Sequence, residues 1–370
     1  MSVKIRRIAI NTGGGDAPGL NAVIRAAVLS ALNRRWEVVG IRRGYNGLLD
    51  TSKIVQLDAN AVRGITHIGG TILGTTNKGD PFEFPMHLPG NPPILVDRSD
   101  EVVDNFKRLK IDALIAIGGD GSMRIASRFA AKGIPVVGVP KTIDNDLTGT
   151  VATFGFDTAV TVASEAIDRL HSTAEAHERV MVVEVMGRYA GWIALNSGVA
   201  STADVILIPE IPFGIDRVCD KITDREARGR RFAIVVVAEG ATPKGGGMVI
   251  KDEEVGREVR LGGIGEQVAR EIERRTGKET RTVVLGHIQR GGRPTTFDRL
   301  LALRFGAAAV RLIEQGIFNH MVALDPPVVR AVPLEVATSR MKTVPVDSDT
   351  VLTARDLGIS FGDGDEESSR

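Results

Sequence analysis

The sequence has almost no cysteine, few aromatic residues and no surplus of charge of either sign. Its single cysteine, Cys219, excludes an internal disulfide bond and fits a reducing compartment. The 47 basic residues balance 46 acidic ones, so no global field favours nucleic acid or a membrane surface as a partner. No apolar run is long enough to span a bilayer, and the first residues show no signal-peptide pattern. These absences predict a cytoplasmic protein that binds neither nucleic acid nor membrane.

Glycine, by contrast, is abundant, with 42 residues among 370. So many glycines beside an aromatic content of 4% indicate that the backbone approaches ligands closely in several places. The length is too great for one comfortable core and suits two domains of ordinary size.

The stretch 111–146 predicts a strand, a helix and a second strand. Its apolar runs Ala113 to Ile117 and Ile134 to Val139 have the length and β-branched content of buried parallel strands, and the segment between them suits a crossover helix. Each run leads into a loop of glycines, carboxylates and hydroxyls. Open parallel sheets bind their ligands at this end of their strands, so we expect the chemistry there.

The same succession of apolar run and polar glycine loop recurs along the chain. Further strand-like runs occupy 5–11, 36–41, 180–185, 204–208, 232–237 and 282–285. Helical spacing of apolar residues fills several intervals, as in 20–32, 99–109, 160–170 and 298–314. We therefore predict an α/β fold of two Rossmann-like three-layer α/β/α domains with mainly parallel sheets, and a cleft lined from both.

The loop at 12–19, Thr-Gly-Gly-Gly-Asp-Ala-Pro-Gly, follows the first strand and opens a helix. Backbone N–H groups and the positive end of a helix dipole converge in such a loop, which suits a phosphate. The loop matches neither the Walker pattern nor Gly-x-Gly-x-x-Gly. A tight structural turn is the alternative interpretation.

Five motifs occur in order along the chain. They are Gly-Gly-Asp-Ala-Pro-Gly-Leu-Asn (14–21), Gly-Gly-Asp-Gly-Ser (118–122), Pro-Lys-Thr-Ile-Asp-Asn-Asp (140–146), Met-Gly-Arg-Tyr-Ala-Gly (186–191) and Gly-His-Ile-Gln-Arg-Gly-Gly (286–292). With these motifs the chain resembles the phosphofructokinase family from Ile5 to about Ile317.

The resemblance implies two domains and a tail. A phosphoryl-donor domain would comprise 1–150 and 291–325, and a sugar-phosphate domain 151–290 and 326–360. Residues 361–370 would form a disordered acidic tail, because their composition is polar and charged.

The resemblance also implies an activity, the Mg²⁺-dependent transfer of the ATP γ-phosphoryl group to the 1-hydroxyl of fructose 6-phosphate. Asp144 would take the hydroxyl proton, Thr142 would bind the transferred group, and Arg188 would stabilise its charge. Asp120 and Asp146 suit Mg²⁺, which prefers a few carboxylate oxygens and keeps several waters.

The implied binding sets are larger. The donor set comprises Gly15, Asn77, Lys78, Gly119, Asp120, Gly121, Ser122 and Lys141. The sugar-phosphate set comprises Thr142, Asp144, Arg179, Met186, Gly187, Arg188, Glu239, Arg281, His287 and Arg290. In the family, residues matching Arg179 and Arg281 reach in from a neighbouring subunit, so the resemblance implies a homo-oligomer and specifically a tetramer.

Positions in the donor loops point to different donors. Asn77 and Lys78 stand where many ATP-using bacterial relatives carry an arginine, and Lys141 matches the pyrophosphate-using relatives. Gly121 is of the ATP type. An aspartate at 121 would place a carboxylate where the α-phosphate must lie, whereas a lysine at 141 excludes neither donor. ATP is therefore the predicted donor, and pyrophosphate is the alternative.

Other classes of protein share single features of the sequence. A dinucleotide-binding dehydrogenase would explain the glycine loop but has no obvious use for the Asp-Asn-Asp triplet. A non-catalytic sugar-phosphate sensor would keep the arginines and lose Asp144, which is present. NAD kinases and lipid kinases share Gly-Gly-Asp-Gly-Ser without the other motifs.

Overall fold

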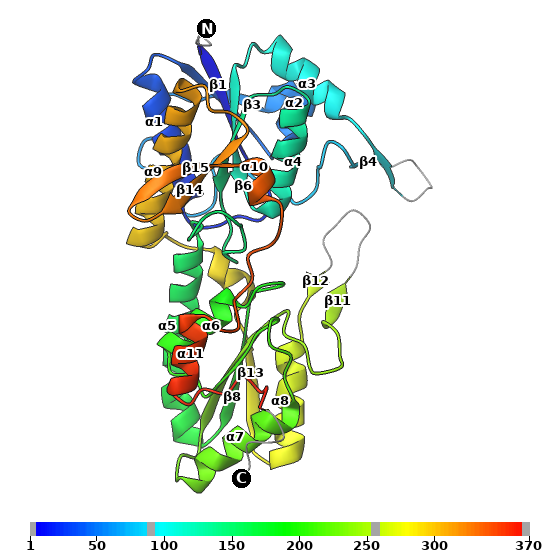
Figure 1. The fold of residues 1–370 in the computed structure, drawn as a ribbon, viewed down its shortest axis with the longest axis vertical. Helices are drawn as coiled ribbons and strands as arrows, with labels where there is room; N and C mark the ends of the chain where they lie inside the picture. The colour runs from blue at the N-terminus through cyan, green and yellow to red at the C-terminus, as the bar shows by residue number, and fades with distance from the viewer. Residues whose placement is uncertain (1–4, 87–92, 253–259, 365–370) are drawn as a thin grey trace.

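Two lobes are stacked along the long axis of the molecule, as the computed structural model in Figure 1 shows. The structure describes residues 5–86, 93–252 and 260–364. Within these ranges, no helix combines the length and the apolar character needed to cross a membrane.

The upper lobe is built on a seven-stranded sheet of order β15-β14-β7-β6-β1-β2-β3. The five central strands are parallel, and β15 and β3 pair antiparallel at the two edges. Their bounds are β1 (Arg7–Thr12), β2 (Glu37–Ile41), β3 (Ile54–Gln56), β6 (Ala113–Gly118), β7 (Val136–Pro140), β14 (His320–Asp325) and β15 (Val328–Pro333).

Helices cover both faces of this sheet. Ile8 and Ile10 of β1 pack with α1 and α9, whereas Ala9 belongs to the core on the opposite face, because successive strand residues alternate in direction. The helices are α1 (Leu20–Leu32) and α9 (Thr296–Glu314) on one face, and α2 (Asn46–Leu49), α3 (Ser99–Arg108), α4 (Asp120–Ala131) and α10 (Leu334–Ala337) on the other. A short 3₁₀ turn (Thr51–Lys53) and a hairpin of β4 (Phe84–Met86) and β5 (Ile94–Val96) complete the lobe.

The lower lobe contains a four-stranded, all-parallel sheet of order β13-β8-β10-β9. Its strands are β8 (Val180–Val185), β9 (Val205–Leu207), β10 (Ala233–Ala238) and β13 (Thr280–Val284). One face packs on α5 (Phe156–His177), α6 (Trp192–Ala200) and α11 (Asp349–Asp356), and the other on α7 (Ile215–Ala227) and α8 (Ile264–Thr276). The hairpin of β11 (Ile250–Asp252) and β12 (Arg260–Leu261) projects beside it (Figure 1), and the 3₁₀ helix η2 (Gly286–Arg290) follows β13.

The two three-layer units confirm the predicted fold class, but the structure corrects two boundaries. Residues 328–333 were expected in the sugar-phosphate domain, yet they form β15 of the larger sheet. Only residues 326 and 327 separate β15 from β14, so the chain must turn back as an antiparallel hairpin. The disordered tail was expected to begin at residue 361, but Phe361 is fully buried in the lower lobe. The rest of that tail, 365–370, lies outside the described residues.

Candidate active site

Polar loops meet at the carboxyl ends of the neighbouring strands β1, β6 and β7. The Gly13 N–H donates to the carbonyl oxygen of Ile117 at 2.9 Å. The Ser122 side chain lies between Gly13 and Gly118, and a Cβ on either glycine would overlap it. The two glycine motifs therefore pack directly on each other, and in this structure Ser122 fills the space between them.

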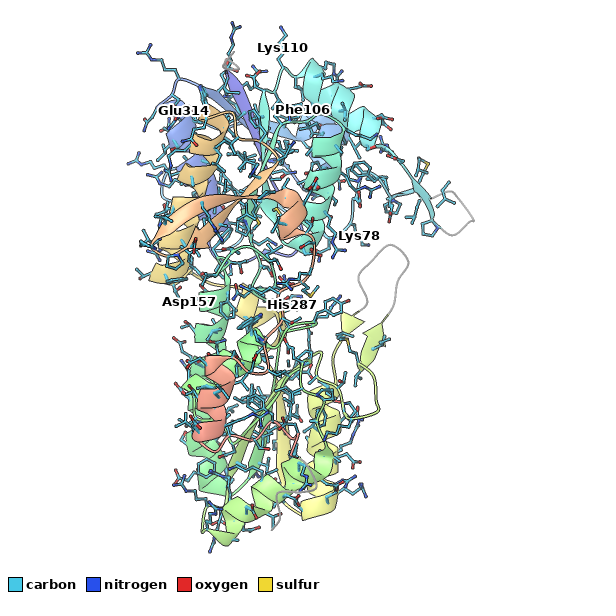
Figure 2. All side chains as sticks on the ribbon, in the orientation of Figure 1. Lys78, Phe106, Lys110, Asp157, His287 and Glu314 are labelled. Atoms are coloured by element: carbon cyan, nitrogen blue, oxygen red, sulfur yellow. The ribbon has the colours of Figure 1, made fainter. Side chains whose placement is uncertain are left out.

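The loop that carries Asn77 and Lys78 is joined to the same glycine loop. The Gly14 N–H donates to the Thr76 carbonyl oxygen at 3.1 Å, and the Lys78 N–H donates to the Thr76 hydroxyl at 3.0 Å. Asn77 and Lys78 are exposed, and Figure 2 shows Lys78 at the lower edge of the upper lobe. These two predicted donor residues thus lie where the upper lobe faces the lower one.

Two cations lie against the glycine loop. Lys141 is 4% exposed, and its ammonium donates to the Gly15 carbonyl oxygen. Burial lowers the pKa of Lys141 to about 8, and the positive charge of Arg290 acts in the same direction. Arg290 donates to the Asp16 carbonyl oxygen at 3.4 Å and lies where a side chain on residue 15 would be. Because residue 15 has no side chain, Arg290 of the motif after β13 can reach the glycine loop at 12–19.

Gly119 and Asp120 open α4, whose first turn leaves open space around Gly121. A Cβ on Gly121 would have no heavy atom within 4 Å, apart from its chain neighbours and the helix backbone. Asp120 pairs with Arg124 at 2.7 Å. Asp120 follows β6 and Asp146 follows the neighbouring strand β7, and the negative charge of Asp120 adds to burial in raising the pKa of Asp146.

The loop after β7 carries Thr142, Asp144 and Asp146. The Asp144 N–H donates to the Thr142 hydroxyl at 3.1 Å. Burial is the main cause of the raised pKa of Asp146, and the Thr142 hydroxyl and Lys141 oppose it. Oδ1 of Asp146 is buried without a hydrogen-bond partner among the described residues. A buried carboxylate oxygen with spare capacity, beside a second carboxylate, fits a magnesium ion that keeps several waters.

The lower lobe contributes the loops after β8 and β10. The Glu239 N–H donates to the Val185 carbonyl oxygen at 2.9 Å, so Glu239 stands beside the segment Met186-Gly187-Arg188. A Cβ on Gly240 would overlap the Arg188 carbonyl oxygen, which shows how closely the two loops pack. Burial raises the pKa of Glu239, and the charges of Arg188 and Arg290 oppose that rise.

Two predicted sugar-phosphate residues lie elsewhere. Arg179 precedes β8 and Arg281 lies in β13, at the amino ends of these parallel strands. Both pair with the Glu279 carboxylate, Arg179 at 2.8 Å. The site loops follow the carboxyl end of β8, roughly 20 Å away for a strand of six residues. One chain therefore does not bring Arg179 and Arg281 to its own site. His287, by contrast, lies at the junction of the lobes (Figure 2).

Comparison with known proteins identifies the family. The Phosphofructokinase family profile matches residues 7–313. A Chloroflexus aggregans protein named ATP-dependent 6-phosphofructokinase is 53% identical over 366 residues, covering 98% of this chain and 99% of that protein. The chain belongs to the phosphofructokinase family. A second relative is named for the other donor. A Streptomyces coelicolor protein named pyrophosphate–fructose 6-phosphate 1-phosphotransferase is 50% identical, covering 96% of this chain and 100% of that protein.

The three-dimensional likeness agrees. A Pichia pastoris phosphofructokinase, whose crystal structure is described as the T-state, superimposes with a TM-score of 0.80 at 30% identity. The match covers 98% of this phosphofructokinase and 37% of the yeast chain.

One element of this phosphofructokinase site was missed by the sequence analysis. Residues 341–344, the C-terminal strap, run beside the loop after β8, residues 186–191, which is called the sugar loop because its motif was assigned to the sugar phosphate. The Val344 N–H donates to Glu210 at 2.7 Å, and Glu210 also accepts from the Gly191 N–H at 3.0 Å. Trp192 donates through Nε1 to the carbonyl oxygen of residue 342 at 3.0 Å. No periodicity or motif in the last fifty residues marked this segment.

Proposed function

We propose that this phosphofructokinase transfers the ATP γ-phosphoryl group to the 1-hydroxyl of fructose 6-phosphate, giving fructose 1,6-bisphosphate. The observation that carries the proposal is the position of the loop after β7. Ile143 of that loop is 2% exposed and packs in the hydrophobic core of the lower lobe together with Met186. The loop's carboxylates therefore lie between the donor loops of one lobe and the sugar loops of the other.

Each residue of the loop has a distinct task in the proposed reaction. Asp144 accepts the proton of the 1-hydroxyl as it attacks, and Thr142 donates a hydrogen bond to the transferred group. Arg188, beside Glu239, stabilises the charge that spreads over the phosphoryl oxygens. Glu239 accepts hydrogen bonds from sugar hydroxyls. The upper lobe binds the donor and the lower lobe binds the sugar phosphate.

A magnesium ion is the metal that the carboxylates suit best. Asp120 and Asp146 are the residues that would hold it, and the unpartnered oxygen of Asp146 is the observation behind this assignment. A bound magnesium ion neutralises phosphate charge during phosphoryl transfer. Without it, the two carboxylates would repel the donor, so EDTA treatment should abolish turnover and Mg²⁺ should restore it.

Pyrophosphate is the second candidate donor. Two observations favour it. The Lys141 ammonium contacts the glycine loop, and the Streptomyces coelicolor relative has pyrophosphate in its name. The open space at Gly121 favours ATP, because a glycine in the first turn of α4 leaves room for a nucleotide phosphate, and an added Cβ there would meet no other described atom within 4 Å apart from its chain neighbours and the helix backbone. The deciding experiment supplies purified protein with fructose 6-phosphate and Mg²⁺, and with either donor. We expect kcat/KM to be higher for ATP, and a preference for pyrophosphate would reverse the assignment.

The active enzyme is, in our proposal, a cytoplasmic homotetramer. Large apolar side chains at the carboxyl end of β13 and in the elements that follow it are exposed in the single chain, namely Val284 (54%), Ile288 (59%) and Phe297 (48%). A second copy would cover them and could supply Arg179 and Arg281 to a neighbouring site. Sedimentation analysis should give four times the mass of one chain, and a stable, active monomer would contradict this. His287 and Arg290 then meet the 6-phosphate from the chain's own side.

A further inference from the structure

The Lys342 side chain lies on the loop that carries Asp144. Its Nζ donates to Asn145 Oδ1 at 3.1 Å and to the carbonyl oxygens of Thr150 and Val151, each at 3.0 Å. An ammonium group has three protons to donate, and these contacts use all of them. They join the beginning of the loop to its end.

Asn145 adopts a left-handed conformation that its side-chain hydrogen bonds support. Its φ is 51°, a region that asparagine enters more readily than most residues because its short polar side chain can hydrogen-bond locally. Asn145 is 5% exposed, and its Oδ1 also accepts from the Thr153 N–H at 3.1 Å. Because Asn145 stands between Asp144 and Asp146, its backbone dihedrals set the directions of both carboxylates. A group that holds the Asn145 side chain therefore acts on both neighbours.

We propose that Lys342 is a positioning residue of the phosphoryl-transfer site, whose ammonium holds Asn145 and the end of the loop so that Asp144 faces the sugar hydroxyl. Lys342 acts through Asn145 and not on a substrate, and the inference rests on the proposed role of Asp144. Its backbone carbonyl accepts from Trp192 Nε1, a bond that a side-chain substitution keeps, and its ammonium lies 5.6 Å from the centroid of the Trp192 ring. Loss of the side chain should therefore disturb the catalytic loop and leave the sugar side in place.

The test combines two substitutions of Lys342 with chemical rescue. In Lys342→Ala we expect kcat to fall by about tenfold or more, while KM for fructose 6-phosphate stays within about threefold of wild type. Propylammonium, which replaces the atoms removed beyond Cβ, should raise kcat of this variant in a saturable way. Lys342→Met fills the same space without a donor, so its kcat should be low and should not respond to the amine.

Lys221→Ala is the matched control. Lys221 also ties a C-terminal residue to the lower lobe, because its Nζ donates to the Gly358 carbonyl oxygen at 2.6 Å, but it does not contact the catalytic loop. We expect its kcat to be that of wild type with and without amine.

Two outcomes would overturn the inference. They are a kcat within about threefold of wild type in both Lys342 variants, and a loss of kcat that propylammonium does not reverse in Lys342→Ala. Failure of the proposed function is distinguishable, because it would appear as normal turnover in Asp144→Asn. Amine rescue of Lys342→Ala does not depend on that result.

Discussion

Arg179 and Met186 flank β8 from opposite ends, with the six residues Val180–Val185 between them. Met186 begins the sugar loop, whereas Arg179 pairs with Glu279 at the far end of the sheet. Parallel strands put their amino ends together, so Arg281 of β13 lies at the same end of the sheet as Arg179. In the oligomer that we propose, these two arginines would serve the site of another subunit.

This arrangement predicts complementation between two inactive variants. Arg281→Ala removes the residue we assign to a neighbour's site, and Arg290→Ala removes one from the chain's own site. Each variant alone should form homo-oligomers of low activity, but mixed oligomers contain some sites that retain both arginines. Co-refolding should recover activity above that of either parent. If mass analysis confirms mixed oligomers and activity does not rise, both arginines serve the same chain.

Asp144→Asn should lower kcat by about two to four orders of magnitude, the usual scale for a lost general base, while KM for fructose 6-phosphate changes much less. Steady-state kinetics measures both. The control is Asp100→Asn, which changes a carboxylate that pairs with Lys132 and is 89% exposed. Turnover within about threefold of wild type in Asp144→Asn would remove Asp144 from the mechanism.

Gly121→Asp tests the donor. The position has room for a side chain, so we expect the variant to fold and its effect to be electrostatic. A carboxylate near the α-phosphate should cut kcat/KM for ATP by about a hundredfold or more, since like-charge juxtaposition costs several kcal/mol. Gly121→Asn adds a side chain of equal size without a charge. It is the control, and its kcat/KM for ATP should fall much less. Pyrophosphate, helped by Lys141, should be less affected, and unaltered ATP kinetics would show that Gly121 does not face the donor.

Gly240→Ala should disturb the sugar loop by steric overlap alone. Its added Cβ would overlap the backbone carbonyl of Arg188, which cannot rotate away as a side chain can. Overpacking of this kind costs roughly 1–3 kcal/mol, so we expect a lower melting temperature and a raised KM for fructose 6-phosphate. Gly247→Ala, in the loop that follows, meets no atom within 4 Å and should leave both unchanged. Equal behaviour of the two variants would contradict the prediction.

Asp298 should make stability depend on pH. It is fully buried between α9 and α5, where the Thr158 N–H and hydroxyl donate to its Oδ2 at 2.7 and 2.6 Å. Burial raises the pKa of Asp298 from 3.8 to about 6, so the protonated form is favoured in the folded protein. The stability that protonated Asp298 contributes is fully present below the unfolded pKa of 3.8, and it is lost as the pH rises through the folded pKa of about 6. A shift of two units corresponds to about 3 kcal/mol.

Asp298→Asn is neutral at every pH and keeps an acceptor for Thr158. Its melting temperature should therefore exceed that of wild type by more at pH 7.5 than at pH 4.5. Thermal denaturation at both values measures the difference, and Asp100→Asn again serves as the exposed control. The same difference at both pH values would show that Asp298 is ionised in the fold at acid pH or does not contribute.

The helices and strands, and the meeting of the polar loops, could be predicted from the sequence because their signals are local. Buried parallel strands are continuous apolar runs, and 180–185 was predicted with the bounds that β8 has. The same is true of α1, whose apolar spacing marks 20–32. The loops at the carboxyl ends of β1, β6 and β7 come together, as a parallel sheet requires.

Only the tertiary structure decided which distant residues support the site. Lys342 and Asn145 are 197 residues apart, and neither belongs to a pattern that links them. The antiparallel strand β15 and the buried Phe361 were also placed wrongly, because an edge hairpin and a single core contact leave no periodic signal. Sequence patterns record how each segment faces its own sheet. Which lobe a terminal segment packs on depends on the shape that all the other segments have already formed.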